Sequence, residues 1–453
     1  MLRHPRPHFG TDGVRGTVGV NLSPEFAYVL GLAVPAVLGI EHDYVVGRDT
    51  RKSGKELSNA FISGLISQGA TVQDLGVLPT PGIASIARDT NSFCCVITAS
   101  HNPAEDNGIK VFDKGGLKTS EELESKIEDK ISELLEEDFD ERYEPVDVNL
   151  EFDGMGSALY VSNLHRKSGV ESLSGLNVVL DCANGAAYGI APTVFKMFGA
   201  ETISINTESD GININNKCGA THLDQLVNTV LESNADIGFA FDGDADRVMV
   251  ADNKGNVRDG DNILALFALE LKEDGELVKD TVVATSMSNG GLKQLLQQNS
   301  INFVETQVGD KYVFAAMEET GAVLGGEQSG HVIRKDIAPW GDGILNALLV
   351  SEILVSKKRS GQTLDSRNLF DLFTPMAQVQ EKVSVSNKSK AVDNSTLKDA
   401  INEHIQILGD NSRVIIRPSG TEEVVRITVE AQDKAAAHAS AEQLVDIVKE
   451  VCE

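Results

Sequence analysis

IGFAFDGDADR (residues 237–247) joins a short apolar run to a polar loop that contains glycine. FCCVITASHNP (93–103) and AVLGGEQSGH (322–331) have the same form. Each stretch closes a segment in which strand-like and helix-like stretches alternate, and alternation of this kind predicts an α/β fold. The segments begin with β-branched runs followed by polar turns, at residues 43–54, 176–185 and 281–291. We therefore expect three similar α/β domains with mixed, largely parallel sheets, and the three polar loops fall at matching positions beyond the last strands, where such sheets bind ligands.

The tail of the chain, from about residue 370, departs from this pattern. Strand-like VQEKVSVS (379–386) is followed by helical STLKDAINEHIQIL (395–408), two strands around a turn (412–430) and a closing helix (434–451). This order predicts a smaller C-terminal α+β domain. The expected domains cover residues 1–150, 151–255, 256–368 and 369–453. The charged stretch at 120–145 predicts an exposed helix that leaves the first segment, and its charges need no functional explanation.

The charge and composition limit the class of protein. The chain has 453 residues, is 41% hydrophobic and 24% charged, and carries a formal net charge of −28. This composition is typical of a globular protein, and the acidity disfavours nucleic acid and anionic membranes as partners. Solubility explains the acidity most simply, with a saline habitat as an alternative. A phosphate ester as substrate would require a local basic cluster.

The five cysteines and the apolar stretches indicate a cytoplasmic protein. Their number is odd and no Cys-x-x-Cys spacing occurs, which argues against a disulfide framework and a zinc site. MLRHPRPHFG at the N-terminus has no apolar signal core. The longest apolar stretch, residues 26–40, contains Pro35 and is shorter than the roughly 20 residues of a membrane span.

Asp242, Asp244 and Asp246 alternate directly after a strand and suggest a metal site. Two like charges about 4 Å apart repel by on the order of 4 kcal/mol at an effective dielectric constant of about 20. A hard divalent cation removes that repulsion and prefers oxygen ligands. An EF-hand is excluded, because Arg247 and Asn253 stand where its loop needs Gly and Glu. A solvated acidic turn remains the alternative.

TASHNP (98–103) places Ser100 in a turn after an apolar strand. His101 follows directly and Lys110 lies shortly beyond. A lone serine in such a loop is ordinarily a turn or cap residue. The chain has no G-x-S-x-G elbow, so nothing favours a serine hydrolase.

Two further loops carry candidate binding groups. In GGEQSGH (325–331), Glu327 and Ser329 can bond sugar hydroxyls, and His331 can exchange protons near neutral pH. In RPSGTEE (417–423), arginine, hydroxyl groups and a glycine-opened turn suit a phosphate cradle. An ordinary turn explains that stretch equally well. The residues of the candidate cradle are Arg417, Ser419, Gly420, Thr421 and the nearby Arg426.

Taken in order over essentially the whole chain, TASHNP, DGDADR, GEQSGH and RPSGTE resemble the α-D-phosphohexomutase family. FGTDGVRG (9–16) and GEQSGH resemble its phosphoglucosamine mutase branch. Phosphomannomutase and phosphoglucomutase relatives more often have Met where Gln328 stands. Glu423 departs from the branch, which commonly has Pro there, and leaves the phosphate-binding residues in place.

The resemblance implies a heart-shaped enzyme of four domains with its site in a central cleft. It implies that Ser100 carries a phosphoryl group and that one Mg²⁺ joins it to the three aspartates. Glucosamine 6-phosphate would receive the phosphoryl group, the 1,6-bisphosphate would turn over, and glucosamine 1-phosphate would leave. The implied catalytic residues besides Ser100 are Arg15, His101, Lys110, Arg247 and His331.

Three alternatives to this function remain open. A phosphomannomutase or phosphoglucomutase would share every motif. A phosphatase would pass the phosphoryl group from Ser100 to water. A non-catalytic phosphosugar-binding relative would have lost the serine or an aspartate, and both are present. The expected partner is a small phosphosugar, and a homodimer is compatible with the sequence.

Overall fold

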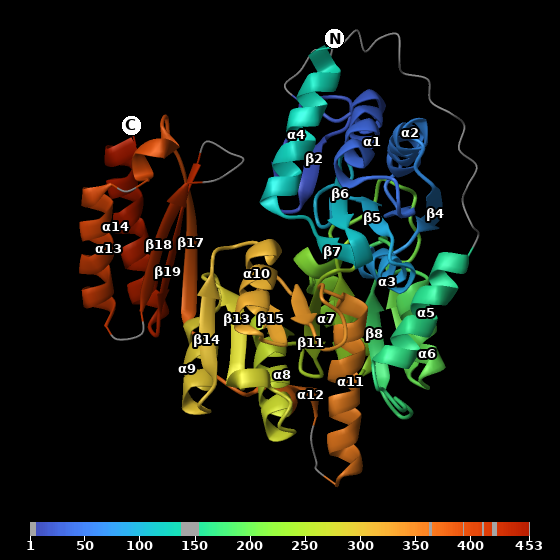
Figure 1. Cartoon of the computed structure of the whole chain (residues 1–453). Coiled ribbons are helices and arrows are strands. Elements are labelled where there is room, and N and C mark those ends of the chain that lie inside the picture. Colours follow the sequence, from blue (N-terminus) through green and yellow to red (C-terminus); the bar gives the residue numbers. More distant parts are fainter. Residues whose placement is uncertain are drawn as a thin grey trace. The chain divides into compact units, whose positions relative to one another are not determined.

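The computed structural model describes residues 6–136, 154–361, 365–392, 394–409, 412–418 and 424–452. It divides into two compact units. The first consists of Met1–Ser286 and Asn302–Phe370, and the second of Met287–Ile301 and Asp371–Glu453. Figure 1 labels the helices and strands of both units.

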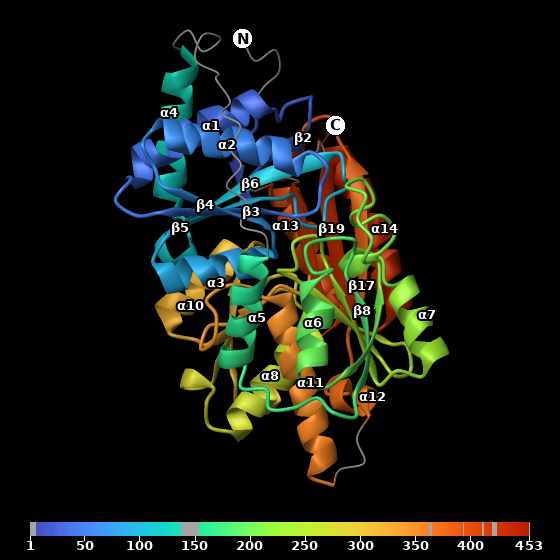
Figure 2. The same ribbon diagram turned by 90° about the vertical axis from the view of Figure 1, so that its right-hand side faces the viewer.

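The first sheet of the first unit has the order β1-β2-β6-β5-β3-β4, with β7 paired to β6. Its strands are β1 (Phe9–Gly10), β2 (Gly13–Thr17), β3 (Tyr44–Arg48), β4 (Val72–Val77), β5 (Phe93–Ile97), β6 (Asp106–Asp113) and β7 (Leu117–Lys118). Its helices are α1 (Pro24–Leu38), α2 (Gly54–Ser67), α3 (Thr80–Thr90) and α4 (Glu121–Glu136), with a 3₁₀ turn η1 (Lys114–Gly116). In Figure 2, α1 and α2 cover one face of this sheet and α3 the other. The stretch of alternating strands and helices from residue 43 is therefore confirmed as a covered sheet.

Helix α4 corrects one expectation about the charged stretch. The helix is present, but it does not simply leave the first segment: Ile127 and Ile131 are fully buried in the same core as α1. Because residues four apart share one face of a helix, these two form an apolar stripe within the charged sequence. Residues 137–145 of the stretch lie outside the described residues.

The second sheet has the order β12-β11-β10-β8-β9, and the third has the order β14-β13-β15-β16. The second sheet contains β8 (Asn177–Asp181), β9 (Glu201–Ile205), β10 (Ile237–Phe241), β11 (Val248–Asp252) and β12 (Val257–Arg258), with α5 (Met155–Lys167), α6 (Ile190–Met197), η3 (Gly219–Thr221) and α7 (Asp224–Ser233). The third contains β13 (Thr281–Thr285), β14 (Asn302–Thr306), β15 (Leu324–Gly326) and β16 (Val332–Arg334), with α8 (Gly260–Glu273), η4 (Val278–Asp280), α10 (Asp310–Thr320), α11 (Gly343–Arg359) and α12 (Ser366–Phe370).

The three sheets repeat one arrangement. In each, a central strand (β3, β8 or β13) pairs in parallel with the next two strands along the chain, and the strand after those runs antiparallel beside the second of them. Among the named strands of the described residues, parallel pairing occurs only in these sets of three, and antiparallel strands extend each sheet. The loops at 98–105, 242–247 and 327–331 therefore occupy the same place, between the third and fourth strands of their sheets. The predicted fold class and the matching positions of the three loops are confirmed.

The second unit is built on an antiparallel sheet with the order β17-β19-β18. The strands are β17 (Ala377–Ser384), β18 (Arg413–Pro418) and β19 (Val424–Ala431), and the helices are α9 (Gly290–Gln298), α13 (Ser395–Leu408) and α14 (Lys434–Cys452), with η5 (Lys388–Ala391). Alternate residues of β19, Val425, Ile427 and Val429, are fully buried in one core with Leu444 and Val448 of α14. This is the predicted small α+β fold.

Among the described residues, no helix is both long and apolar enough to cross a membrane. The apolar stretch at 26–40 forms α1, which ends at Leu38 and packs against α2. All five cysteines are buried and free of disulfide bonds.

Candidate active site

Ser100 lies in the loop between β5 and β6 and is fully buried. Its backbone has a φ of 52°, a left-handed conformation that costs energy for any residue but glycine. Its Oγ donates a hydrogen bond of 2.6 Å to Oδ2 of Asp242, and Nδ1 of His101 lies 3.3 Å from the same oxygen. Strained residues that the surroundings hold in place mark functional positions, and Ser100 has both properties.

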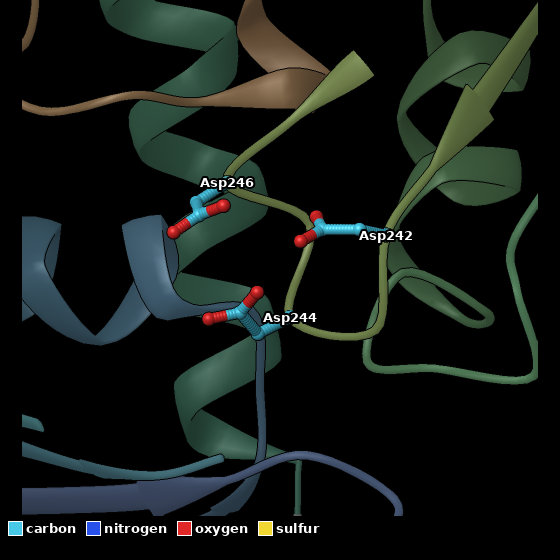
Figure 3. A group of neighbouring side chains, drawn as sticks. All are labelled: Asp242, Asp244 and Asp246. Carbon is cyan, nitrogen blue, oxygen red and sulfur yellow. The ribbon is translucent and has the colours of Figure 1, made fainter. Parts of the chain in front are cut away.

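The loop between β10 and β11 carries Asp242, Asp244 and Asp246, whose carboxylates converge in Figure 3. One oxygen of each lies within 4.8 Å of the others, and all three residues are buried. Burial, together with Asp246 and Asp244, raises the pKa of Asp242 well above its usual value. Within the described part of the chain, no group donates a hydrogen bond to Oδ1 of Asp244 or to Oδ1 of Asp246. Buried, unsatisfied carboxylate oxygens at this spacing fit a hard divalent cation, and the described residues contain no second group of this kind.

Lys110 on β6 places a buried ammonium against these carboxylates. Its Nζ lies 2.9 Å from Oδ2 of Asp12, 2.9 Å from Oδ2 of Asp244 and 3.0 Å from Oδ2 of Asp246. Burial alone would lower the pKa of Lys110, but Asp12, Asp244 and Asp246 hold it well above its usual value. Thr80, at the start of α3, donates a further bond of 2.7 Å to Oδ2 of Asp244.

A ring of alternating charges continues from Lys110 through the third sheet. Nζ of Lys118 lies 2.9 Å from Oδ1 of Asp12 and 2.7 Å from Oδ2 of Asp310. The ring nitrogens of His331 lie 3.7 Å from Asp310 and 3.6 Å from Asp246. Burial would lower the pKa of His331, but Asp246 and Asp310 raise it overall. Lys118 and Asp310 lie outside every motif of the sequence described above, and Asp12 was noted only as part of FGTDGVRG.

Arg15, Arg247 and His101 complete the predicted catalytic set around the trio. Arg15 forms an ion pair with Asp12, and Nε of Arg247 lies 3.8 Å from Oδ1 of Asp246. Burial lowers the pKa of His101 to about 3, and the charges of Arg247 and Arg15 act in the same direction. His101 is therefore a neutral imidazole at neutral pH.

Hydrogen bonds and close packing fix the side chains of Glu327 and His331, which lie in the loop between β15 and β16. Oε1 of Glu327 accepts a bond of 3.0 Å from the backbone of Gly309, and Oε2 accepts one of 3.3 Å from Ser329. A Cβ at Gly341 would lie 2.4–2.7 Å from atoms of the His331 ring. Only glycine at position 341 leaves room for the imidazole in this place.

An open pocket of about 370 Å³, mouth included, borders this ring of charges. Its charged lining comes from Lys118, Asp246, Asp310 and His331. The remaining lining is largely apolar and consists of Thr80, Phe112, Gly116, Phe314, Ile333, Pro339, Trp340 and Gly341.

The predicted phosphate cradle belongs to the second unit. Arg417 on β18 is the direct cross-strand partner of Arg426 on β19. Burial and the charge of Arg426 both lower the pKa of Arg417. Like charges directly opposite on a sheet are destabilising, which suits a place that receives an anion. Ser419, Gly420 and Thr421, like Glu423, lie outside the described residues.

Four family models match the chain in succession. They describe the alpha/beta/alpha domains I, II and III and the C-terminal domain of phosphoglucomutase/phosphomannomutase, and they match residues 6–138, 158–255, 259–369 and 381–447. The chain belongs to the phosphoglucomutase/phosphomannomutase family. The predicted family resemblance is confirmed, and the protein is a phosphohexomutase-type enzyme.

Relatives within this family match over nearly the full length. A phosphoglucosamine mutase of Clostridioides difficile (strain 630) is 43% identical over 451 residues, which cover 98% of this chain and 99% of the relative. One from Nocardioides sp. is 44% identical over 456 residues and covers 97% and 98%.

Solved structures of the family share the fold. A phosphoglucomutase/phosphomannomutase family protein of Burkholderia thailandensis superposes with a TM-score of 0.78 at 27% identity, covering 97% of both chains. An Aspergillus fumigatus N-acetylphosphoglucosamine mutase, in complex with GlcNAc-6P and magnesium, has a TM-score of 0.70 at 19% identity and covers 100% and 97%.

Proposed function

We propose that this enzyme interconverts glucosamine 6-phosphate and glucosamine 1-phosphate through a phosphorylated Ser100. The observation that supports the proposal is the 2.6 Å hydrogen bond from Oγ of Ser100 to Asp242, which joins this hydroxyl group to the buried acidic trio. The choice of sugar follows from relatives at 43–44% identity that bear the name phosphoglucosamine mutase. Gln328, where other branches more often have Met, agrees with that choice.

The proposed reaction moves one phosphoryl group out and another back. The bond between phosphorus and Oγ of Ser100 breaks as the O1 hydroxyl of glucosamine 6-phosphate attacks, and the proton of that hydroxyl ends on Oγ. The 1,6-bisphosphate turns over in the site. Oγ of Ser100 then takes the phosphoryl group from O6, which regains a proton, and glucosamine 1-phosphate leaves. Positioning and charge stabilisation supply most of the catalysis in such transfers.

Asp242, Asp244 and Asp246 would hold one Mg²⁺ beside Ser100. The bound ion would offset the charge of about −1.5 to −2 that a phosphoserine adds. Nζ of Lys110 pairs with Oδ2 of Asp244 and Oδ2 of Asp246 at 2.9 and 3.0 Å.

The remaining roles rest on the family resemblance and are part of the proposal. Neutral His101, 3.3 Å from Oγ of Ser100, would share a hydrogen bond with that oxygen and orient it. Lys110 and His331 are candidates for proton transfer at the sugar oxygens. Arg15 and Arg247 would stabilise phosphoryl oxygens, and Glu327 and Ser329 would bind sugar hydroxyls. The distal phosphate would bind to Arg417, Ser419, Gly420, Thr421 and Arg426.

The predicted cellular setting and assembly also stay proposals. Five buried, unpaired cysteines suit a reducing cytoplasm. A homodimer and the domain limits at residues 150, 255 and 368 are proposed on the sequence alone.

Turnover of glucosamine, mannose and glucose 6-phosphates by the purified enzyme, with Ser100→Ala as the matched control, tests the proposal. We expect the highest kcat/KM for the glucosamine phosphates, no turnover by the variant, and an added phosphate on Ser100 in the mass of the intact protein. Equal or better turnover of mannose phosphate would favour a phosphomannomutase. Release of inorganic phosphate faster than isomerisation would favour a phosphatase, and binding without turnover a non-catalytic relative.

A further inference from the structure

Two side chains that none of the motifs includes hold the same two carbonyl groups of the Ser100 loop. Nη2 of Arg51 donates to the carbonyl oxygens of Ser100 and Asn102 at 3.0 and 2.8 Å. Nδ2 of Asn215 donates to these two oxygens at 2.9 and 3.1 Å. Each carbonyl therefore receives one bond from a guanidinium and one from an amide.

Arg51 directs both terminal nitrogens of its guanidinium toward this loop. Nη1 donates to the carbonyl oxygens of Pro103 and Asp106, the latter at 2.9 Å, and Nε donates to Oδ2 of Asp49 at 2.9 Å. The side chain is fully buried. A planar guanidinium whose two terminal nitrogens both donate to carbonyl groups in and directly after one loop fixes the path of that loop more tightly than a lysine ammonium can.

These bonds close a cycle through the backbone of the nucleophile. The N–H of Ser100 donates to Oγ1 of Thr98 at 2.9 Å, and Thr98 donates to Oδ2 of Asp49 at 2.7 Å. Asp49 accepts from Arg51, which donates to the carbonyl of Ser100. The backbone N–H and C=O of Ser100 are therefore both hydrogen-bonded. This stabilises the left-handed conformation of the residue, as a strained position requires.

Asn215 also lies close to the loop that carries the acidic trio. It lies between β9 and α7 of the second sheet, has a φ of 57°, and its N–H donates to the carbonyl of Ala183 at 2.9 Å. A Cβ at Gly243 would lie 2.5 Å from the carbonyl oxygen of Ser100 and 3.0 Å from Nδ2 of Asn215. The serine loop, the metal loop and this amide therefore meet at one point.

We propose that Arg51 and Asn215 are positioning residues. They hold Oγ of Ser100 at a fixed place relative to the carboxylates of Asp242, Asp244 and Asp246. The inference rests on the proposed function. Phosphoryl transfer requires the nucleophile and the groups that stabilise the charge to keep one geometry, and a small displacement of either slows the chemical step. Neither residue needs to touch the sugar, so their loss affects the chemical step and leaves substrate binding intact.

The test uses variants of Asn215 that spare the backbone. Asn215→Gly removes the amide and suits a positive φ, and Asn215→Asp keeps the shape but turns a carboxylate toward two carbonyl oxygens. We expect kcat to fall about ten- to a hundredfold in both, with KM within about threefold of the wild-type value. Arg51→Lys is expected to show the same split. Transfer from the 1,6-bisphosphate to Ser100, followed by intact mass, should slow by the same factor as kcat.

Asn163→Ala is the matched control, because Asn163 is 7% exposed, as Asn215 is, and its amide donates to Ser85 on α3. We expect its kcat to stay within twofold of the wild type. A normal kcat in folded Asn215→Gly and Arg51→Lys would overturn the inference, as would a fall in kcat that only follows the melting temperature or that Asn163→Ala shares. Absence of turnover in the wild type would instead contradict the proposed function.

Discussion

Replacement of Lys110 by methionine tests how the site balances its buried charges. The ammonium is 2% exposed and lies 2.9–3.0 Å from Asp12, Asp244 and Asp246. At an effective dielectric constant of about 20, each contact is worth roughly 5–6 kcal/mol before desolvation is counted. Desolvation offsets most of that sum, and breaking a buried ion pair by removing one partner costs about 3–5 kcal/mol.

We therefore expect Lys110→Met to lower the melting temperature of the first unit by on the order of 10 °C and to abolish turnover. Three carboxylates then lie together without their cation, so Mg²⁺ should raise the melting temperature of the variant more than that of the wild type. Differential scanning calorimetry with and without excess Mg²⁺ measures both effects.

Lys358→Met is the control for loss of an ordinary ion pair. Lys358 pairs with Asp236 at 2.7 Å, but its side chain is 35% exposed, so its removal should cost about 1 kcal/mol or less. An unchanged melting temperature in Lys110→Met, or an equal Mg²⁺ effect on variant and wild type, would refute this account of the charge balance.

Three further predictions concern the metal, the phosphate and the pH. Asp244→Asn should abolish most of the activity and weaken Mg²⁺ binding measured by calorimetry, and full activity after thorough chelation would contradict the metal site. Arg417→Ala should raise KM for both sugar phosphates about ten- to a hundredfold while Ser100 can still be phosphorylated, and an unchanged KM in both directions would place the cradle elsewhere. Burial raises the pKa of Asp342 to about 6, so the folded state holds this proton to higher pH than the unfolded state, and stability is lost as pH rises from about 4 to 6. Asp342→Asn keeps the acceptor for Leu345 and Tyr160 and should be up to about 3 kcal/mol more stable than the wild type at pH 7.5, an advantage that thermal melts should show shrinking at pH 5.

The alternation of strands and helices was visible in the sequence because each element carries its own local pattern. Apolar runs such as residues 237–241 are buried throughout, and the loops that follow them hold Ser100 and the three aspartates. The docking of α4 was missed because charged residues dominate its sequence, although Ile127 and Ile131, together with Leu134 and Leu135, pack in the core that contains α1.

The residues that hold the catalytic groups in place show no local pattern in the sequence. Asp310 meets Lys118 and His331 across separations that no motif spans, and Arg51 stood in a stretch that predicted only a turn. Gly341 matters through the ring of His331 packed against it, a relation that exists only in three dimensions. Residue type and spacing therefore identify the groups that do chemistry, whereas the groups that hold them in place emerge from packing.

With a net charge of −28, an enzyme that binds phosphate groups needs cations close to its site. In the structure, the cations at the site already lie near carboxylates. Lys110 and Arg15 pair with carboxylates of the site, and Nε of Arg247 lies 3.8 Å from Asp246, so the site's own acids already offset part of this positive charge. A phosphoserine at position 100 adds about −1.5 to −2 beside Asp242. Because those acids already offset part of the positive charge, the added negative charge favours binding of a divalent cation, and Oδ1 of Asp244 and Oδ1 of Asp246 are where such an ion fits. Phosphorylation of Ser100 and metal binding would then favour each other by the same free energy, as reciprocal linkage requires.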